Sequence, residues 1–262
     1  MRIDDSLIDQ WTADGDHFFF DMPSGWMQGR STFGGLTAAA MASLARRVVP
    51  ESDRSLRVFS TQLLAPVVPG PMRGEVSVLR SGRNITFTDV RLMQGDAVVA
   101  RATPVFAKAV SESLDVAPAP KPEVTAPETL QSIPYVPGFM PEFTQHVDMR
   151  WAEGATPYSG SDAALFVGHC RYRVPLGGAA GLLALLDTWP APSLGMARKP
   201  IPASTVSWTA HLLNVPSNFG QWFTFRYETA VGTSGLHTVV GHLYAEDGTL
   251  VGWSEQMVAV FG

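Results

Sequence analysis

Two side chains of types that could do chemistry stand out because they lie in apolar stretches of the sequence. Gln256 is an amide within the strand-like run Val251–Val260. It is either a hydrogen-bonded core group or a functional one, and the position favours function. Asp187 is the single charge at the end of the run Leu182–Leu186. An acid near a helix C-terminus opposes the helix dipole, which indicates a specific partner or a cap on a nearby turn.

Two adjacent glycines, Gly34 and Gly35, stand at the start of a predicted helix over 33–45. Without side chains they would let a carbonyl group reach the helix N-terminus, whose free N–H groups and dipole stabilise an oxyanion. The alternative is that they only allow close packing of the backbone. The two interpretations are compatible.

Several kinds of active site are not expected. The chain has no G-x-S-x-G, no G-x-x-x-x-G-K and no G-x-G-x-x-G after a strand. Its six histidines form no H-x-x-x-H pair, so we expect neither a metal nor another cofactor. Cys170 is the single cysteine and lies in the middle of a strand-like run, where a buried, inert thiol is favoured over a nucleophile.

The composition and charge limit the kinds of binding partner that we expect. Hydrophobic residues make up 45% of the 262 residues and charged residues only 16%, which indicates a large core or a subunit interface and favours a homo-oligomer. The net charge is −5 and no Lys/Arg block is present, so we expect no nucleic-acid partner. The acidic N-terminus lacks the apolar core of a signal peptide, and no apolar run could span a membrane. A cytoplasmic protein is expected.

The order of elements predicts an α+β fold. Alanine and leucine favour a helix over 33–45 that is small and apolar on all sides, and a second apolar helix over 177–189. Each is followed by a run of antiparallel strands separated by Pro, Gly and Asp turns. The predicted strands are 18–20, 57–65, 72–80, 87–94, 97–107, 166–173, 205–213, 223–233, 236–244 and 250–260.

This order is a repeat, because the segment Arg57–Phe106 returns in outline as Thr205–Phe261. Both copies open with an alternating apolar run and end with an acidic-glycine turn and a last strand. A repeat of this length is one supersecondary unit used twice, so a site between the halves is expected. We predict an N-terminal unit over 1–110, a proline-rich extended crossover over 111–142 and a C-terminal unit over 143–262.

Three motifs resemble the acyl-CoA thioesterase II family. They are Thr32-Phe33-Gly34-Gly35, Leu79-Arg80-Ser81-Gly82-Arg83-Asn84 and the stretch from Glu246 to Gln256. The resemblance covers nearly the whole chain in order. It implies a double hotdog, in which two antiparallel sheets, each wrapping a central helix, join into one continuous sheet. It also implies hydrolysis of an acyl-CoA thioester by water, without a metal or a covalent nucleophile.

The resemblance also implies site residues. In that family an aspartate, a threonine and a glutamine of the second half position the attacking water. Gln256 matches the glutamine, Ser207 stands at the aspartate position, and the threonine falls at Thr229 or at the adjacent Ala230. Asp187 could replace the aspartate in space. Arg80 and Arg83 are candidate contacts for the CoA phosphates.

Three functions remain open from the sequence. The first is an acyl-CoA thioesterase-like hydrolase. The second is a non-catalytic acyl-CoA binding or interaction module with a degraded site, which Ser207 supports because a hydroxyl is a poor base near neutral pH. The third, a hydratase or dehydratase, ranks last because no His pairs with an acid at either helix start.

Overall fold

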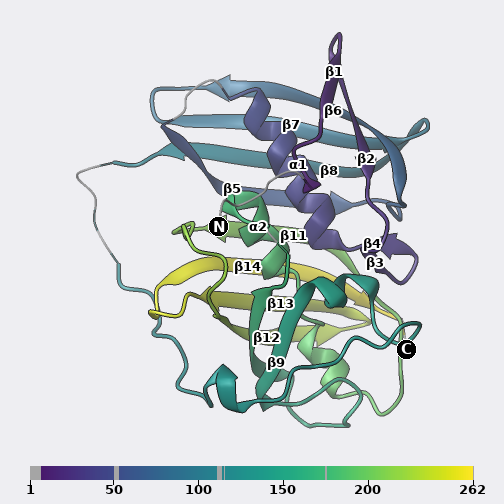
Figure 1. Cartoon of the computed structure of the whole chain (residues 1–262), viewed down its shortest axis with the longest axis vertical. Coiled ribbons are helices and arrows are strands. Elements are labelled where there is room, and N and C mark those ends of the chain that lie inside the picture. Colours follow the sequence, from purple (N-terminus) through teal and green to yellow (C-terminus); the bar gives the residue numbers. More distant parts are fainter. Residues whose placement is uncertain (1–6, 50–52, 111–113, 115, 175, 262) are drawn as a thin grey trace.

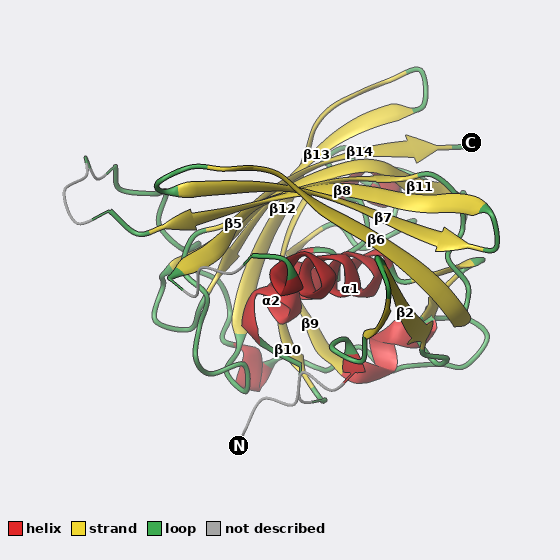
Figure 2. Cartoon of the chain, turned by 90° about the horizontal axis from the view of Figure 1, so that it is seen from above, coloured by secondary structure: helices red, strands yellow, loops and turns green. Residues whose placement is uncertain are grey.

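One 12-stranded antiparallel sheet and two helices dominate the computed structural model, which describes residues 7–49, 53–110, 114, 116–174 and 176–261. Helices α1 (Gly34–Arg47) and α2 (Gly178–Leu186) lie side by side on one face of the sheet (Figure 2). The strands of the large sheet are β1 (Thr12–Asp14), β2 (His17–Met22), β5 (Arg54–Leu63), β6 (Gly70–Ser81), β7 (Ile85–Gln94), β8 (Ala97–Lys108), β9 (Val147–Gly154), β10 (Leu165–Tyr172), β11 (Ala203–Leu212), β12 (Phe223–Thr233), β13 (Leu236–Tyr244) and β14 (Leu250–Val260). A separate two-stranded ribbon, β3 (Met27–Gln28) and β4 (Ser31–Thr32), precedes α1.

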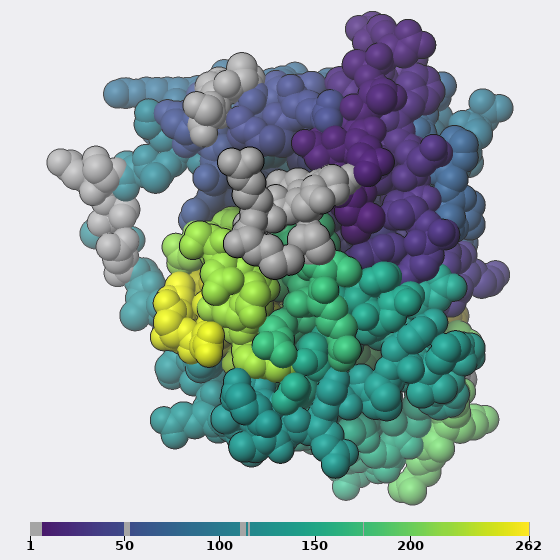
Figure 3. Space-filling view, in the orientation of Figure 1, coloured from purple at the N-terminus to yellow at the C-terminus, as the bar shows by residue number. Residues whose placement is uncertain are grey.

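The sheet runs continuously through both halves of the chain. Its strand order is β1-β2-β6-β7-β8-β5-β11-β14-β13-β12-β10-β9, so β5 of the first half pairs with β11 of the second (Figure 1). The space-filling view shows the first half packed directly on the second (Figure 3). This is the double hotdog arrangement that the sequence predicts.

The repeat in the sequence is a repeat in the structure. The carbonyl of Val99 accepts the N–H groups of Leu64 and Ala65, and the carbonyl of Val251 accepts those of Leu213 and Asn214 in the same way. At the seam Ser60 lies opposite Thr209, and their hydroxyls are 3.1 Å apart. The halves are therefore related by an approximate two-fold axis through the β5–β11 pair.

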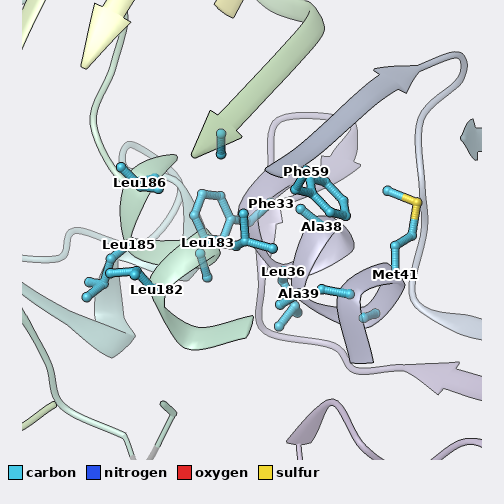
Figure 4. Close-up of a cluster of buried hydrophobic side chains, with 14 of the residues drawn as sticks. Phe33, Leu36, Ala38, Ala39, Met41, Phe59, Leu182, Leu183, Leu185 and Leu186 are labelled. Atoms are coloured by element: carbon cyan, nitrogen blue, oxygen red, sulfur yellow. The ribbon is translucent and has the colours of Figure 1, made fainter. Parts of the chain in front are cut away.

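The core lies between the helices and the inner face of the sheet. The alanine-rich α1 is buried along most of its length, and Leu183 of α2 lies beside Phe33 at the start of α1 (Figure 4). Small side chains on α1 allow this close approach, as the sequence pattern indicates. Along β14, Ser254, Gln256 and Val258 face this core while the residues between them face outward.

Most elements match their predicted ranges, and β12, β13 and β14 match at both ends. The strands β1, β3, β4 and β9 were not predicted, and α2 ends at Leu186 rather than at residue 189. Between β8 and β9 the described residues form only two short 3₁₀ helices, η2 (Pro127–Thr129) and η3 (Glu142–His146). Cys170 is fully buried, which raises the pKa of its thiol to about 12, as expected for an unreactive cysteine. No helix in the described part of the chain has the length and apolarity to cross a bilayer.

Candidate active site

A cavity of about 380 Å³ lies where the N-terminus of α1 meets the C-terminus of α2. Its walls also include the ends of β11 and β14 and the segment that follows β5. Gly34, Asp187, Thr205 and Gln256 line it together, although they come from four different elements. The cavity thus collects residues from both halves.

Asp187 is the C-cap residue of α2, directly after Leu186, and its carboxylate faces the first turn of α1. The backbone N–H of Gly35 is directed at this carboxylate. A methyl group on Gly34 would lie 2.7 Å from Asp187 Oδ2, so only glycine fits there without displacing the acid. At Gly35 a methyl group would lie 2.9 Å from the Ala184 Cα and closer still to the Phe33 ring. Gly34 therefore makes room for the acid, and Gly35 makes room for the helix contact.

A chain of hydrogen bonds connects the polar groups of the cavity. The Thr205 hydroxyl donates to Gln256 Oε1 over 2.9 Å, and Gln256 Nε2 donates to Asp187 Oδ1 over 2.8 Å. A carboxylate accepts only, so the amide must turn its nitrogen to Asp187 and its oxygen to the threonine. The chain leaves the second amide hydrogen of Gln256 and lone pairs of Asp187 available for a small molecule in the cavity.

Burial raises the pKa of Asp187 to about 7, and the hydrogen bonds from Gln256 and Gly35 partly offset this. The α2 C-terminus also disfavours a negative charge, whereas the α1 N-terminus favours it. A carboxyl group with a pKa near 7 exchanges its proton at neutral pH. It has the property that a general base needs there.

The register of the sheet decides which residue of β11 can hydrogen-bond to Gln256. Alternation alone would place Thr205 and Ser207 on one face, but a β-bulge falls between them. Thr205 pairs with the inward-facing Val258, whereas Ser207 pairs with the outward-facing Met257. Ser207 therefore lies on the outer face of the sheet, away from Gln256. This corrects the expectation that Ser207 takes the place of the aspartate beside Gln256.

Two family models match the chain. The acyl-CoA thioesterase N-terminal domain matches residues 22–107, and the acyl-CoA thioesterase C-terminal domain matches residues 118–260. The chain belongs to the acyl-CoA thioesterase family. It is a thioesterase-like hydrolase.

Solved structures show the same fold over the whole chain. A hot dog fold protein of Alicyclobacillus acidocaldarius has 23% identity and a TM-score of 0.87, covering 100% of this chain and 98% of its own. The TesB protein of Mycobacterium avium subspecies paratuberculosis has 17% identity and a TM-score of 0.80, covering 99% of both chains. Acyl-CoA thioesterase II TesB2 of Mycobacterium marinum has 15% identity and a TM-score of 0.78, covering 98% of both. A search of curated proteins found no match.

Thr229 of the thioesterase lies away from the hydrogen-bonded chain. It is aligned with Val239 and, one strand further, with Gln256, so its backbone is two strands from the glutamine, roughly 10 Å. Its hydroxyl accepts the N–H of Ser193 over 3.0 Å and so fixes the segment after α2. The threonine that is hydrogen-bonded to Gln256 is Thr205 instead. The structure does not bring Thr229 to Gln256.

Arg80 and Arg83 lie near the start of β5, whereas this cavity lies at the end of β5, so they cannot contact it. Arg54, at the start of β5, donates to the carbonyls of Gly82 and Arg83, whereas Leu63, at the end of β5, lines the cavity. Nine residues of extended strand separate these ends by about 30 Å. Among the described residues the basic side chain that lines the cavity is Arg30, between β3 and β4.

The position related by the two-fold axis has no comparable chemistry. The repeat aligns Val99 with Val251, which places Pro104 of β8 at the position of Gln256. The matching bulges of β5 and β11 place Leu56 at the position of Thr205. The thioesterase therefore carries the Thr-Gln-Asp chain in one of its two related positions.

Proposed function

We propose that this protein hydrolyses acyl-CoA thioesters by direct attack of water, with Asp187 as the general base. The connected chain Thr205–Gln256–Asp187 carries the proposal, because it holds an acid with a pKa near 7 at a cavity between two helix ends. The family match supplies the substrate class, an acyl-CoA.

The reaction needs one proton to be moved twice. A water held by Asp187 and by the free amide hydrogen of Gln256 attacks the thioester carbonyl carbon while Asp187 takes its proton. The carbonyl becomes a tetrahedral oxyanion. When this intermediate collapses, the C–S bond breaks and the leaving CoA thiolate takes the proton from Asp187, which gives a free acid and CoA. Thr205 acts by holding the amide in its orientation.

The first turn of α1 is suited to the oxyanion. The N–H groups of a first helical turn have no intrahelical acceptor, and the helix dipole favours a negative charge beside them. Because Gly35 already serves Asp187, the N–H of Gly34 is the group we assign to the oxyanion. The reaction as proposed uses no metal and no other cofactor.

The acyl-CoA phosphates need a cationic contact outside the cavity. Arg30 is exposed at the tip of the β3–β4 ribbon and lines the mouth of the cavity, so we assign it this contact. Arg80 and Arg83 are replaced in this role.

The alternative, a non-catalytic binding module, depended on the interpretation that Ser207 stands where the family has its catalytic aspartate. A carboxylate is supplied from another element, the end of α2, and it is hydrogen-bonded to the expected glutamine. The reason for a degraded site is thereby removed, and hydrolysis is the better proposal.

We also propose a cytoplasmic homo-oligomer active in lipid metabolism, with units 1–110 and 143–262 joined by the crossover 111–142. The outer face of the sheet supports self-association, because one cross-strand row joins Phe87, Val105, Val58, His211, Trp253 and His242. Phe87 in this row and Met257 nearby are each about two-fifths exposed. The low charge fraction supports it further.

Release of free thiol from short, medium, long and aromatic acyl-CoAs tests the proposed activity. The purified protein should hydrolyse at least one of them, and the rate should fall when Asp187 is replaced. Binding of every acyl-CoA without release of thiol would favour the binding module instead.

A further inference from the structure

One polar group of the cavity has no part in the proposed mechanism. Tyr227 of β12 lines the cavity, and the residue as a whole is 1% exposed. No described residue gives its hydroxyl a hydrogen bond, and this oxygen is not among the fully enclosed side-chain atoms that lack a partner, so it faces the open space of the cavity. The hydroxyl is therefore free to donate a hydrogen bond to a molecule bound in the cavity.

Tyr227 shares the cavity with the reacting groups Asp187 and Gln256. Tyr227 pairs with Gly241, and the edge of its ring lies 3.1 Å from where a Gly241 side chain would begin. The missing side chain gives the ring room beside β13, the strand next to β14 and its Gln256. Tyr227 is also close enough to Asp187 for the carboxylate charge to act on its phenol.

We propose that Tyr227 is a further catalytic residue, whose hydroxyl donates a hydrogen bond to the carbonyl oxygen of the bound thioester. This rests on the proposed function. Together with the Gly34 N–H it would give the oxyanion two donors, one from α1 and one from the sheet.

The phenol of Tyr227 is suited to donate a hydrogen bond while keeping its proton. Burial, and then the charge of Asp187, raise the pKa of Tyr227 well above its usual value. It therefore stays protonated over the pH range in which Asp187 acts as a base. A donor fixed before the reaction stabilises developing charge without reorganising.

The test is Tyr227→Phe, which keeps the ring and removes the hydroxyl, with Tyr244→Phe as its matched control. Tyr244 of β13 is equally buried and its hydroxyl likewise has no hydrogen bond to a described residue, but it does not line the cavity. With the best acyl-CoA, Tyr227→Phe should lower kcat roughly 100-fold with little change in KM, and Tyr244→Phe should leave both unchanged. An unchanged kcat, an effect on KM alone, or an equal loss in both variants would overturn the proposal.

A second measurement keeps this test separate from the proposed hydrolysis. S-acetonyl-coenzyme A keeps a carbonyl group but cannot be hydrolysed, and its binding is measured by calorimetry. Tyr227→Phe should raise its Kd about 10-fold over wild type, as the loss of one hydrogen bond implies. Absence of thioester hydrolysis in the wild type would then contradict only the proposed function, whereas an equal Kd in both proteins would contradict the role of Tyr227.

Discussion

Gln256 Nε2 lies 2.8 Å from Asp187 Oδ1, and this contact joins β14, the last strand along the chain, to the end of α2, 69 residues earlier. It gives the partly buried acid a donor that partly offsets the effect of burial on its pKa. The amide is in turn held by Thr205 from the neighbouring strand. The site is therefore a property of how three elements pack and not of a local motif.

Activity should depend on pH through Asp187. The base acts only when ionised, so kcat should be low below the pKa of about 7, rise through it and level off above it. Gln256→Ala removes a hydrogen bond that lowers this pKa, so the remaining activity should rise at a higher pH than in wild type. The check is kcat for one acyl-CoA across the pH range in both proteins; a Gln256→Ala profile that moves to lower pH would contradict this account.

Asp187 should make the protein less stable at high pH. Its folded pKa of about 7 exceeds the ordinary 3.8, so between these values the folded state binds more protons and stability falls as pH rises. The loss is complete above pH 7 and is on the order of 4 kcal/mol. Asp187→Asn should therefore raise Tm at pH 8 and change it little at pH 4. Equal effects at both pH values would show that the acid is not buried as described.

Thr205 and Ser207 form a matched pair for testing the sheet register. Thr205→Val should lower kcat by roughly 10-fold or more, because the amide of Gln256 loses the group that orients it. Thr205→Ser should restore most of the rate. Ser207→Ala, on the outer face, should behave as wild type, and Ser207→Asp should bring no gain. Steady-state kinetics of the four variants test this assignment. A Ser207→Asp enzyme that is faster than wild type would contradict the register that places Ser207 on the outer face.

The two glycines that begin α1 should separate activity from stability. Gly34→Ala places a methyl group 2.7 Å from Asp187 Oδ2 and should mainly reduce kcat. Gly35→Ala places one 2.9 Å from the Ala184 Cα and should mainly lower Tm, because the backbone of α2 must move. Thermal melts and turnover measured on both variants give the comparison; the reverse pattern would show that the two roles are exchanged.

The sequence predicted the fold well because the repeat, the small residues of α1 and the alternation of the strands all indicate the same architecture. Gln256 was selected because it matches the glutamine of the family that the sequence resembles, and the two glycines because paired glycines at a helix start stand out. The sequence could not distinguish Thr205 from Ser207, because the β-bulge between them is a property of the paired strands. Thr229 was selected over Thr205 from an approximate register for the same reason.

Asp187 shows what the sequence holds and what it lacks. Its unusual place at a helix C-terminus was visible, but its partner is distant in the chain and is brought near only by packing of α2 on β14. Tyr227 was missed because it lies in a strand with other aromatic residues, and nothing in its neighbours marks it as facing a cavity. Arg80 and Arg83 were selected from a turn that β5 separates from the cavity by its full length.

Turnover of Asp187→Asn tests the central claim most directly. The variant keeps the size of the side chain and can still meet Gln256, but it cannot take a proton from water. Measured by thiol release at pH 8 with the best acyl-CoA substrate, its kcat should fall at least about 100-fold while the protein stays folded. A folded Asp187→Asn protein with the kcat of wild type would contradict the assignment of Asp187 as the base.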